Sequence, residues 1–157
     1  SSAAFAADTT APIQVTSSVT SSCLIEGVGA VDFGTYDPVG RNSYLTQAKQ
    51  SSMNLRCNGG TTARIQISEG LNRGQMSGCS APVRRLKAGD NTYMDYRFLV
   101  KQTSGATAVI GCAANAQHSV TFTALETKEI RFQSELPAGQ AAPVGDYADT
   151  LTVRVFF

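Results

Sequence analysis

Apolar and polar residues alternate in steps of two along the first part of the chain. From position 11 the odd positions are mostly apolar, and from position 14 the even positions are polar; the odd positions are Ala11, Ile13, Val15, Ser17, Val19, Ser21 and Cys23. Because successive side chains of a strand point to opposite faces, this pattern predicts a long extended segment with one weakly apolar face. No hairpin turn follows that would fold the segment onto the next strand.

Shorter runs with the same period recur along the rest of the chain, whereas helical patterning is scarce. The predicted strands lie at 28–33, 53–57, 63–67, 83–86, 94–100, 106–112, 118–123, 130–136 and 147–157. The turn signal Asn58-Gly59-Gly60 suggests that 53–67 is one strand with a turn or bulge and a continuation. A long loop is expected over 68–91, interrupted by the short strand at 83–86. About seven or eight strands separated by turns predict an all-β sandwich of immunoglobulin-like size.

The two ends of the chain do not fit an ordinary sandwich. The cleanest strand stops at Phe157 with no partner strand after it, while the segment around Ile13 has no hairpin neighbour. A sandwich that lacks one strand exposes an apolar groove and a free edge that another chain can fill. A spare strand and a missing strand together predict head-to-tail pairing between copies, which forms filaments because such contacts do not close. The alternative is that residues 11–19 fold back as an edge strand of their own domain.

Composition limits the classes of protein to which this chain can belong. Its 157 residues suffice for one domain at ~150 residues per domain, and 42% hydrophobic residues allow a full core. Charged residues make up 16%, against a typical share of roughly 25%, which excludes disorder driven by charge. The net charge of +1 excludes recruitment of nucleic acid or an anionic membrane by the overall field. No apolar run approaches the ~20 residues needed to cross a bilayer, so we expect no membrane insertion.

Four widely spaced cysteines, Cys23, Cys57, Cys79 and Cys112, indicate an oxidising compartment. None forms a C-x-x-C pair, so the spacing of zinc knuckles and thioredoxin-like sites is absent. Three connectivities are possible, and the alternative to all of them is four buried free thiols. We favour Cys23 with Cys57 and Cys79 with Cys112, because each cysteine lies on or beside a separate extended segment and the two loops are nearly equal.

The first residues are similar to the end of a secretory signal. Ala4-Phe5-Ala6, followed by Ala7, fits an A-x-A cleavage site, although no charged or long apolar region precedes it. We therefore expect residues 1–7 to be a signal-peptide remnant, 8–22 to be an N-terminal extension and 23–157 to be the folded domain.

Side chains that could carry chemistry are few, and we predict no catalytic, cofactor-binding or metal site. The single histidine, His118, has no nucleophile or companion ligand near it in the sequence. Asp146 and Asp149 are three residues apart on a predicted strand, so they would point to opposite faces instead of acting as a pair. We therefore expect a protein that is not an enzyme.

Two further groups could contact a carbohydrate or a partner. A small basic cluster is expected to be a solvated edge that discourages strand pairing; it consists of Arg84, Arg85 and Lys87. A set of tyrosines could stack on a sugar, but the alternation places at least Tyr96 in the core.

Several motifs together resemble the spore coat protein U domain. They are Cys23, the run Asp32-Phe33-Gly34-Thr35-Tyr36-Asp37-Pro38, Leu55-Arg56-Cys57, Arg84-Arg85-Leu86 and the run PAGQAAPVGDYADTLTV at 137–153. The resemblance spans roughly residues 23–157, and the C-terminal run is its most specific part. The family includes the major and minor pilins of archaic chaperone-usher pili, such as the Csu biofilm pilus.

The resemblance implies an incomplete immunoglobulin-like sandwich that lacks its last strand and is completed by donor-strand complementation. In such pilins a periplasmic chaperone lends a strand to the groove, and an outer-membrane usher exchanges it for the N-terminal strand of the next subunit. On this chain the implied donor strand carries Ala11, Ile13, Val15 and Val19. The implied edge of the acceptor groove carries Leu151, Val153, Val155 and Phe157. The family's first disulfide corresponds to Cys23 with Cys57, and the other two cysteines look like an addition.

The implied function is that of a structural pilin in a secreted surface fibre that supports adhesion and biofilm formation. Its partners would be other pilin subunits, the chaperone and the usher, and its route would lead through the periplasm to a cell-surface pilus. Two alternatives stay open: a structural protein of a spore coat or outer layer, and a carbohydrate-binding tip adhesin. Tip adhesins have a further binding domain and no use for a donor strand, so the donor-like segment favours a pilin.

Overall fold

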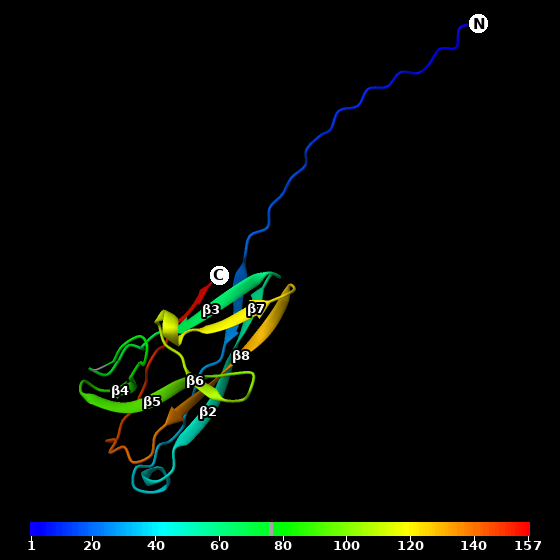
Figure 1. The fold of residues 1–157 in the computed structure, drawn as a ribbon. Coiled ribbons are helices and arrows are strands. Elements are labelled where there is room, and N and C mark those ends of the chain that lie inside the picture. Colours follow the sequence, from blue (N-terminus) through cyan, green and yellow to red (C-terminus); the bar gives the residue numbers. More distant parts are fainter. Residues whose placement is uncertain (76) are drawn as a thin grey trace.

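The computed structural model describes residues 1–75 and 77–157, and nearly all of its regular structure is β-sheet (Figure 1). Two short 3-10 helices, η1 (Arg41–Ser43) and η2 (Ala114–Ala116), lie between strands. The strands are β1 (Cys23–Val28), β2 (Gln47–Cys57), β3 (Thr61–Ile67), β4 (Arg84–Ala88), β5 (Thr92–Lys101), β6 (Thr107–Val109), β7 (His118–Phe122), β8 (Glu126–Leu136) and β9 (Val153–Phe156). The predicted all-β class is confirmed.

The strands form two antiparallel sheets. The larger sheet has the order β1-β2-β8-β5-β4, with β6 pairing with β5, and the smaller sheet has the order β7-β3-β9. At the centre of the larger sheet β2 and β8 pair along their whole length, from Gln47 opposite Leu136 to Cys57 opposite Glu126. Within the described residues β1 pairs only with β2, and β9 pairs only with β3. Each sheet therefore ends in a strand with one free edge.

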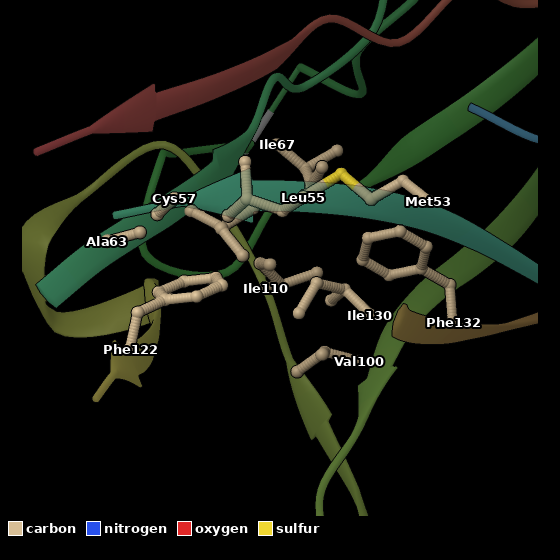
Figure 2. Packing of buried hydrophobic residues seen from close by; sticks show 11 residues of the cluster. Met53, Leu55, Cys57, Ala63, Ile67, Val100, Ile110, Phe122, Ile130 and Phe132 are labelled. Carbon is tan, nitrogen blue, oxygen red and sulfur yellow. The ribbon is translucent and has the colours of Figure 1, made fainter. Parts of the chain in front are cut away.

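The main core lies between the two sheets and is built from the inward faces of their strands. Along β3 and the second half of β8 every second residue is buried, as expected for strands that present their other face to solvent. Figure 2 shows side chains of β2 and β8 meeting around Ile110 and Phe122. The buried cluster consists of Met53, Leu55, Cys57, Ala63, Ile65, Ile67, Val100, Ile110, Phe122, Ile130 and Phe132. Burying one such aliphatic or aromatic side chain contributes about 1.5–3 kcal/mol, so this cluster is a main source of stability.

The turn at residues 58–60 carries the chain from the larger sheet to the smaller one. Gly60 has a φ of +83°, a left-handed conformation that favours glycine. A Cβ atom on Gly59 would lie 2.9 Å from the carbonyl oxygen of Thr123, so the turn packs closely against the loop between β7 and β8. The predicted turn is confirmed, but β2 and β3 belong to different sheets, so 53–67 is not one continuing strand.

Both favoured disulfides form. Cys23 and Cys57 lie opposite each other on β1 and β2, with 4.2 Å between their Cα atoms. Cys79 and Cys112 join the loop before β4 to the segment after β6, with 4.6 Å between their Cα atoms. The predicted connectivity is confirmed, and the described part of the chain contains no free cysteine.

Two of the predicted strands are misplaced. The first strand of the domain is Cys23–Val28, whereas the prediction of a strand at 28–33 is wrong because residues 29–33 join no ladder. The last strand is Val153–Phe156 and not 147–157, because its partner β3 ends at Ile67, opposite Val153.

Residues 11–22 of the segment predicted as extended over 11–23 pair with no strand of the described domain, and Cys23 is the first residue of β1. Residues 1–22 run away from the body of the protein as an extended stretch, drawn in blue in Figure 1. The regular ladder begins only at Cys23. Folding back of residues 11–19 onto their own domain does not occur in this structure.

Arg84 is buried, so the prediction of a solvated basic edge is wrong for this residue. It is 2% exposed, and its guanidinium donates hydrogen bonds to the carbonyl oxygens of Ile67 (3.1 Å), Ser68 (2.9 Å), Phe98 (3.3 Å) and Ile110 (2.8 Å). Buried carbonyl groups need partners, and one arginine here supplies them to segments that are far apart in the sequence. Burial lowers the pKa of Arg84, because the charged form loses hydration.

Candidate functional site

One side of the sandwich is bordered by two stretches of chain between which no described strand lies. The first border is β1 with the residues that follow it as far as 36, and the second is residues 142–152 with β9. Among the described strands, β1 and β9 each have a single neighbour. Backbone N–H and C=O groups along a free strand edge can pair with an added strand, so this side of the protein can take one.

A large cavity of about 910 Å³ lies between these borders. Strands β5 and β8 line it with Tyr96, Phe98, Phe132, Ser134 and Leu136. These side chains are mostly apolar, and apolar surface that faces a water-filled space is stabilised when another apolar group covers it. The cavity is therefore suited to a partner with aliphatic or aromatic side chains.

A smaller cavity of about 300 Å³ lies farther along β9. It is lined by Cys23, Leu24, Ile25, Leu55, Val155 and Phe157. The two cavities share the same two borders, and we refer to them together as the groove. A partner in extended conformation could follow the groove along β9.

The four residues predicted as the groove's edge all line these cavities. Leu151 and Val153 line the large cavity, whereas Val155 and Phe157 line the small one. The first three are half-buried against the core, and Phe157 is 56% exposed. Their role in accepting a strand stays a prediction.

A hydrogen-bonded pair of polar side chains lies in the wall of the large cavity. The hydroxyl of Tyr96 donates to Asp149 Oδ2 at 2.6 Å. The other oxygen of Asp149 accepts hydrogen bonds from the backbone N–H of Leu71 at 2.9 Å and from Asn72 Nδ2 at 3.3 Å. Burial and the hydrogen bond to Asp149 raise the pKa of Tyr96, so this hydroxyl keeps its proton. The pair ties the stretch before β9 to β5 and to the loop after β3.

The predicted donor residues lie outside the folded domain. Ile13, Val15 and Val19 are 87%, 88% and 86% exposed, and Ala11 is exposed as well. The structure does not bring these residues to the groove of their own chain. Their donation to another chain stays a prediction.

Asn58 fixes the last residues of the extension to the domain. Its Oδ1 accepts a hydrogen bond from the N–H of Ser22 at 2.9 Å, and its Nδ2 donates to the carbonyl oxygen of Thr20 at 2.9 Å. The buried hydroxyl of Thr61 donates to the same Oδ1 at 2.7 Å and so holds the amide in place. The freely extended part of the chain therefore ends at Val19. The sequence analysis did not predict this contact, and the only local sign of it in the sequence is the Asn-Gly turn.

The sequence analysis also did not predict most of the residues that line the groove. Residues 33–36 and the side chains of β5 and β8 line the large cavity, but none was predicted as a groove residue. Alternation does place Phe132, Ser134 and Leu136 on one face of a strand. It does not show which part of that face stays uncovered, because this depends on the missing neighbour.

His118 and one group of ligand-type side chains are the remaining candidates for a chemical role. His118 is half-buried on β7 opposite Ile65, and burial lowers its pKa. Glu69, Cys79 and Cys112 place three ligand-type atoms within 4.8 Å of one another, but both sulfur atoms belong to a disulfide and cannot act as thiolates. No helix in the described ranges has the length and apolar character needed to cross a membrane.

Comparison with solved structures shows what this sandwich is similar to. It matches a chain of the CsuC–CsuE chaperone-tip adhesion subunit pre-assembly complex from archaic chaperone-usher Csu pili of Acinetobacter baumannii, with a TM-score of 0.59 and 22% identity. This match covers 88% of the present chain and 40% of the other chain. The rod subunit PapA of the P pilus matches with a TM-score of 0.58 and 14% identity, over 85% of this chain and 97% of that one. These similarities confirm the predicted fold class of an incomplete immunoglobulin-like sandwich.

Comparison of sequences identifies the family. The family model of the Spore Coat Protein U domain matches residues 9–154. The chain is also 32% identical over 163 residues to Protein U of Myxococcus xanthus, a match that covers 99% of this chain and 89% of that protein. The chain therefore belongs to the Spore Coat Protein U domain family.

Proposed function

We propose that this protein is a structural subunit of a secreted surface fibre and that it polymerises by donating its N-terminal segment to the groove of another copy. The observation that carries the proposal is that one chain has two features that suit a strand-pairing contact. It has an open apolar groove with free edges, and it has a free segment with one apolar face. Contacts between two different surfaces of the same protein do not close, so they extend into a fibre.

The donor segment and the groove are matched in chemistry. Ile13, Val15 and Val19 lie on one face of the extended segment, so all three can enter the groove together while the polar residues between them face solvent. Burying each of these side chains contributes ~1.5–3 kcal/mol. A ladder of main-chain hydrogen bonds along the free edges adds to this. Such a contact holds subunits together without nucleotide hydrolysis or a cofactor.

An open groove needs protection before assembly, because a free apolar edge promotes aggregation. The Acinetobacter structure is a complex of a chaperone with a tip subunit, and PapA is a rod subunit. By analogy we propose a periplasmic chaperone, an outer-membrane usher and other pilin subunits as partners, and a cell-surface pilus that supports adhesion and biofilm formation as the destination. In this proposal residues 1–7 are a leader remnant, 8–22 are the donor extension and 23–157 are the acceptor domain.

Val15→Asp tests this proposal. A carboxylate in an apolar groove is strongly unfavourable, so we expect at least about tenfold fewer SDS-resistant oligomers that collapse to monomers on boiling. Binding to the chaperone should be unchanged, because the chaperone supplies its own strand. Thr16→Asp, on the polar face of the same segment, is the matched control and should assemble like the wild type. Equal ladders from Val15→Asp and the wild type would contradict the proposal.

A second candidate function is that of a structural protein in a spore coat or outer layer. The description of the family and the similarity to Protein U of Myxococcus xanthus favour it. The same strand pairing could build a coat instead of a pilus. Neighbouring genes for a chaperone and an usher would support the pilus, whereas production confined to spores would support the coat.

A further inference from the structure

A buried hydroxyl group in the groove has no hydrogen-bond partner. Ser134 on β8 is 1% exposed, and its Oγ makes no hydrogen bond with the described residues. Gln47 Oε1 and Ser51 Oγ also lack partners there, but neither of these residues lines the groove. Because an unpaired buried hydroxyl is unfavourable, Ser134 is a place where a ligand with a polar group gains an interaction.

The donor segment carries a hydroxyl on its inward face. Ser17 shares this face with Ile13, Val15 and Val19, because all four lie at odd positions of an extended segment. Between positions 11 and 19 it is the one polar residue on this face. A hydroxyl that enters an apolar groove loses its hydration and needs a partner inside.

We propose that Ser17 of one copy lies opposite Ser134 of the next copy and that this polar pair sets the register in which the donor strand enters the groove. The inference rests on the proposed function, since it requires residues 11–19 to occupy the groove. Facing layers of a sandwich are about 10 Å apart, so two short serine side chains leave room for one water molecule between them. This water donates a hydrogen bond to one hydroxyl and accepts one from the other, so both hydroxyls gain a partner.

The polar pair also places the apolar residues of the donor. Two residues advance a strand by about 6.6–6.8 Å on both the donor and β8. With Ser17 at Ser134, the next inward donor residues on either side, Val15 and Val19, therefore meet Phe132 and Leu136. A shift by two residues would bury Ser17 against an apolar side chain and leave Ser134 facing an aliphatic one. Both hydroxyls would then be unpaired, just as a misplaced polar residue penalises the wrong register of a coiled coil.

A double-mutant cycle on the full chain tests the pairing. The measured quantity is the rate at which assembled oligomers dissociate in SDS at a fixed temperature. Ser17→Val and Ser134→Val each leave one hydroxyl buried without a partner, so we expect each to raise the rate about tenfold. The double variant removes both hydroxyls and fills the space of the water, so its rate should lie within about threefold of the wild-type rate. Ser18→Val, on the outward face of the donor, is the matched control and should leave the rate unchanged.

The outcomes separate the pairing from the proposed function. If the two single effects multiply in the double variant, Ser17 and Ser134 do not meet and the inference is wrong. If Val15→Asp assembles as well as the wild type, the groove does not take this segment and the proposed function fails. Loss of assembly in Val15→Asp together with a restored rate in the double variant supports both. Should Ser134→Val fail to fold, Ser134→Ala removes the hydroxyl without added volume, and the same non-additive result is expected with Ser17→Ala.

Discussion

Arg84 and Tyr96 are polar side chains buried beside the groove, and each joins segments that are distant in the sequence. The guanidinium of Arg84 binds carbonyl groups from four positions, and its Cζ lies 5.9 Å from the centre of the Phe98 ring. The hydroxyl of Tyr96 binds Asp149, which also holds the loop after β3. The bond between Tyr96 and Asp149 holds one border of the groove in place, while Arg84 joins β3, β5 and the segment after β6.

Arg84→Met is expected to destabilise the domain. Methionine fills a similar volume but cannot donate, so buried carbonyl groups lose their partner and the free energy of unfolding should fall by about 3 kcal/mol. Urea unfolding in a Val15→Asp background, which keeps subunits unpaired, measures the effect. Arg154→Met is the control: this residue is exposed, its guanidinium lies 4.5 Å from the Phe156 ring centre, and the expected loss is below about 1 kcal/mol. Equal losses for the two variants would contradict the structural role of Arg84.

Tyr96 should make the stability of the domain depend on pH in the alkaline range. Burial and Asp149 raise its pKa in the folded state, whereas an unfolded tyrosine titrates near pH ~10. Its contribution is fully present below pH ~10 and is lost above it, because the unfolded chain then releases a proton that the folded chain retains. Between pH ~10 and ~11 the free energy of unfolding of the wild type should therefore fall by about 1 kcal/mol more than that of Tyr96→Phe. Urea unfolding at a series of pH values measures this. Tyr44→Phe, at an exposed site, is the control. If the free energy of unfolding of Tyr96→Phe and of the wild type changes in parallel with pH, the effect is ruled out.

At the scale of residues, the sequence predicts which side chains face inward better than it predicts what they contact. Alternation correctly places Tyr96 in the core, and the four cysteines pair as the spacing suggests. The burial of Arg84 could not be predicted, because it depends on carbonyl groups that come together only in the folded chain. The unpaired Ser134 is visible as a polar residue in an apolar face, but its place in the groove is not.

The N-terminal extension is joined to the domain at the turn after β2, through the side chain of Asn58. Asn58 binds the backbone on both sides of Ser21, next to the disulfide between Cys23 and Cys57. The extension thus leaves the domain in a direction that the turn after β2 sets (Figure 1). In a fibre built as proposed, this junction would define the angle between consecutive subunits.

Asn58→Ala is expected to loosen this junction. The Ser22 amide loses its acceptor, so its hydrogen should exchange roughly fivefold to tenfold faster, as expected for the loss of a net hydrogen bond of about 1 kcal/mol. Amide exchange followed by NMR on the Val15→Asp subunit measures the change. Asn54→Ala, at an exposed position of β2, is the control and should leave Ser22 unaffected. An unchanged Ser22 rate in Asn58→Ala would show that the side chain does not hold the extension.

At the scale of elements, the misplaced strands have one physical cause. Alternation at 28–33 and 147–152 indicates a face that can be buried, but a ladder also needs a neighbouring strand. Both stretches border the large cavity, and among the described residues their contacts with a neighbouring strand are isolated ones, between Gly29 and Ser52 and between Ala148 and Lys87. Strands with neighbours on both sides, such as β3 and β5, were predicted close to their observed positions, whereas residues 47–52 of β2 and 126–129 of β8 were missed.

The molecule as a whole combines a folded domain that is open on one side with a segment that has nothing to pack against. Its low net charge of +1 and its few reactive side chains fit a building block whose interactions are strand pairing and apolar burial. The 157 residues give a core of ordinary size, and in the proposed fibre a second copy completes it.

Moving the donor segment within one chain tests whether the groove accepts it. In the variant, residues 8–22 are removed from the N-terminus and attached after Phe157 through a short flexible linker, so that the segment can fill the groove of its own domain. The measurement is the free energy of unfolding, compared with the same variant carrying Val15→Asp. We predict a monomer that is more stable than this control by on the order of 5 kcal/mol, the sum expected from burying three aliphatic side chains. Equal stability of the two proteins would show that the groove does not accept the segment and would contradict the account.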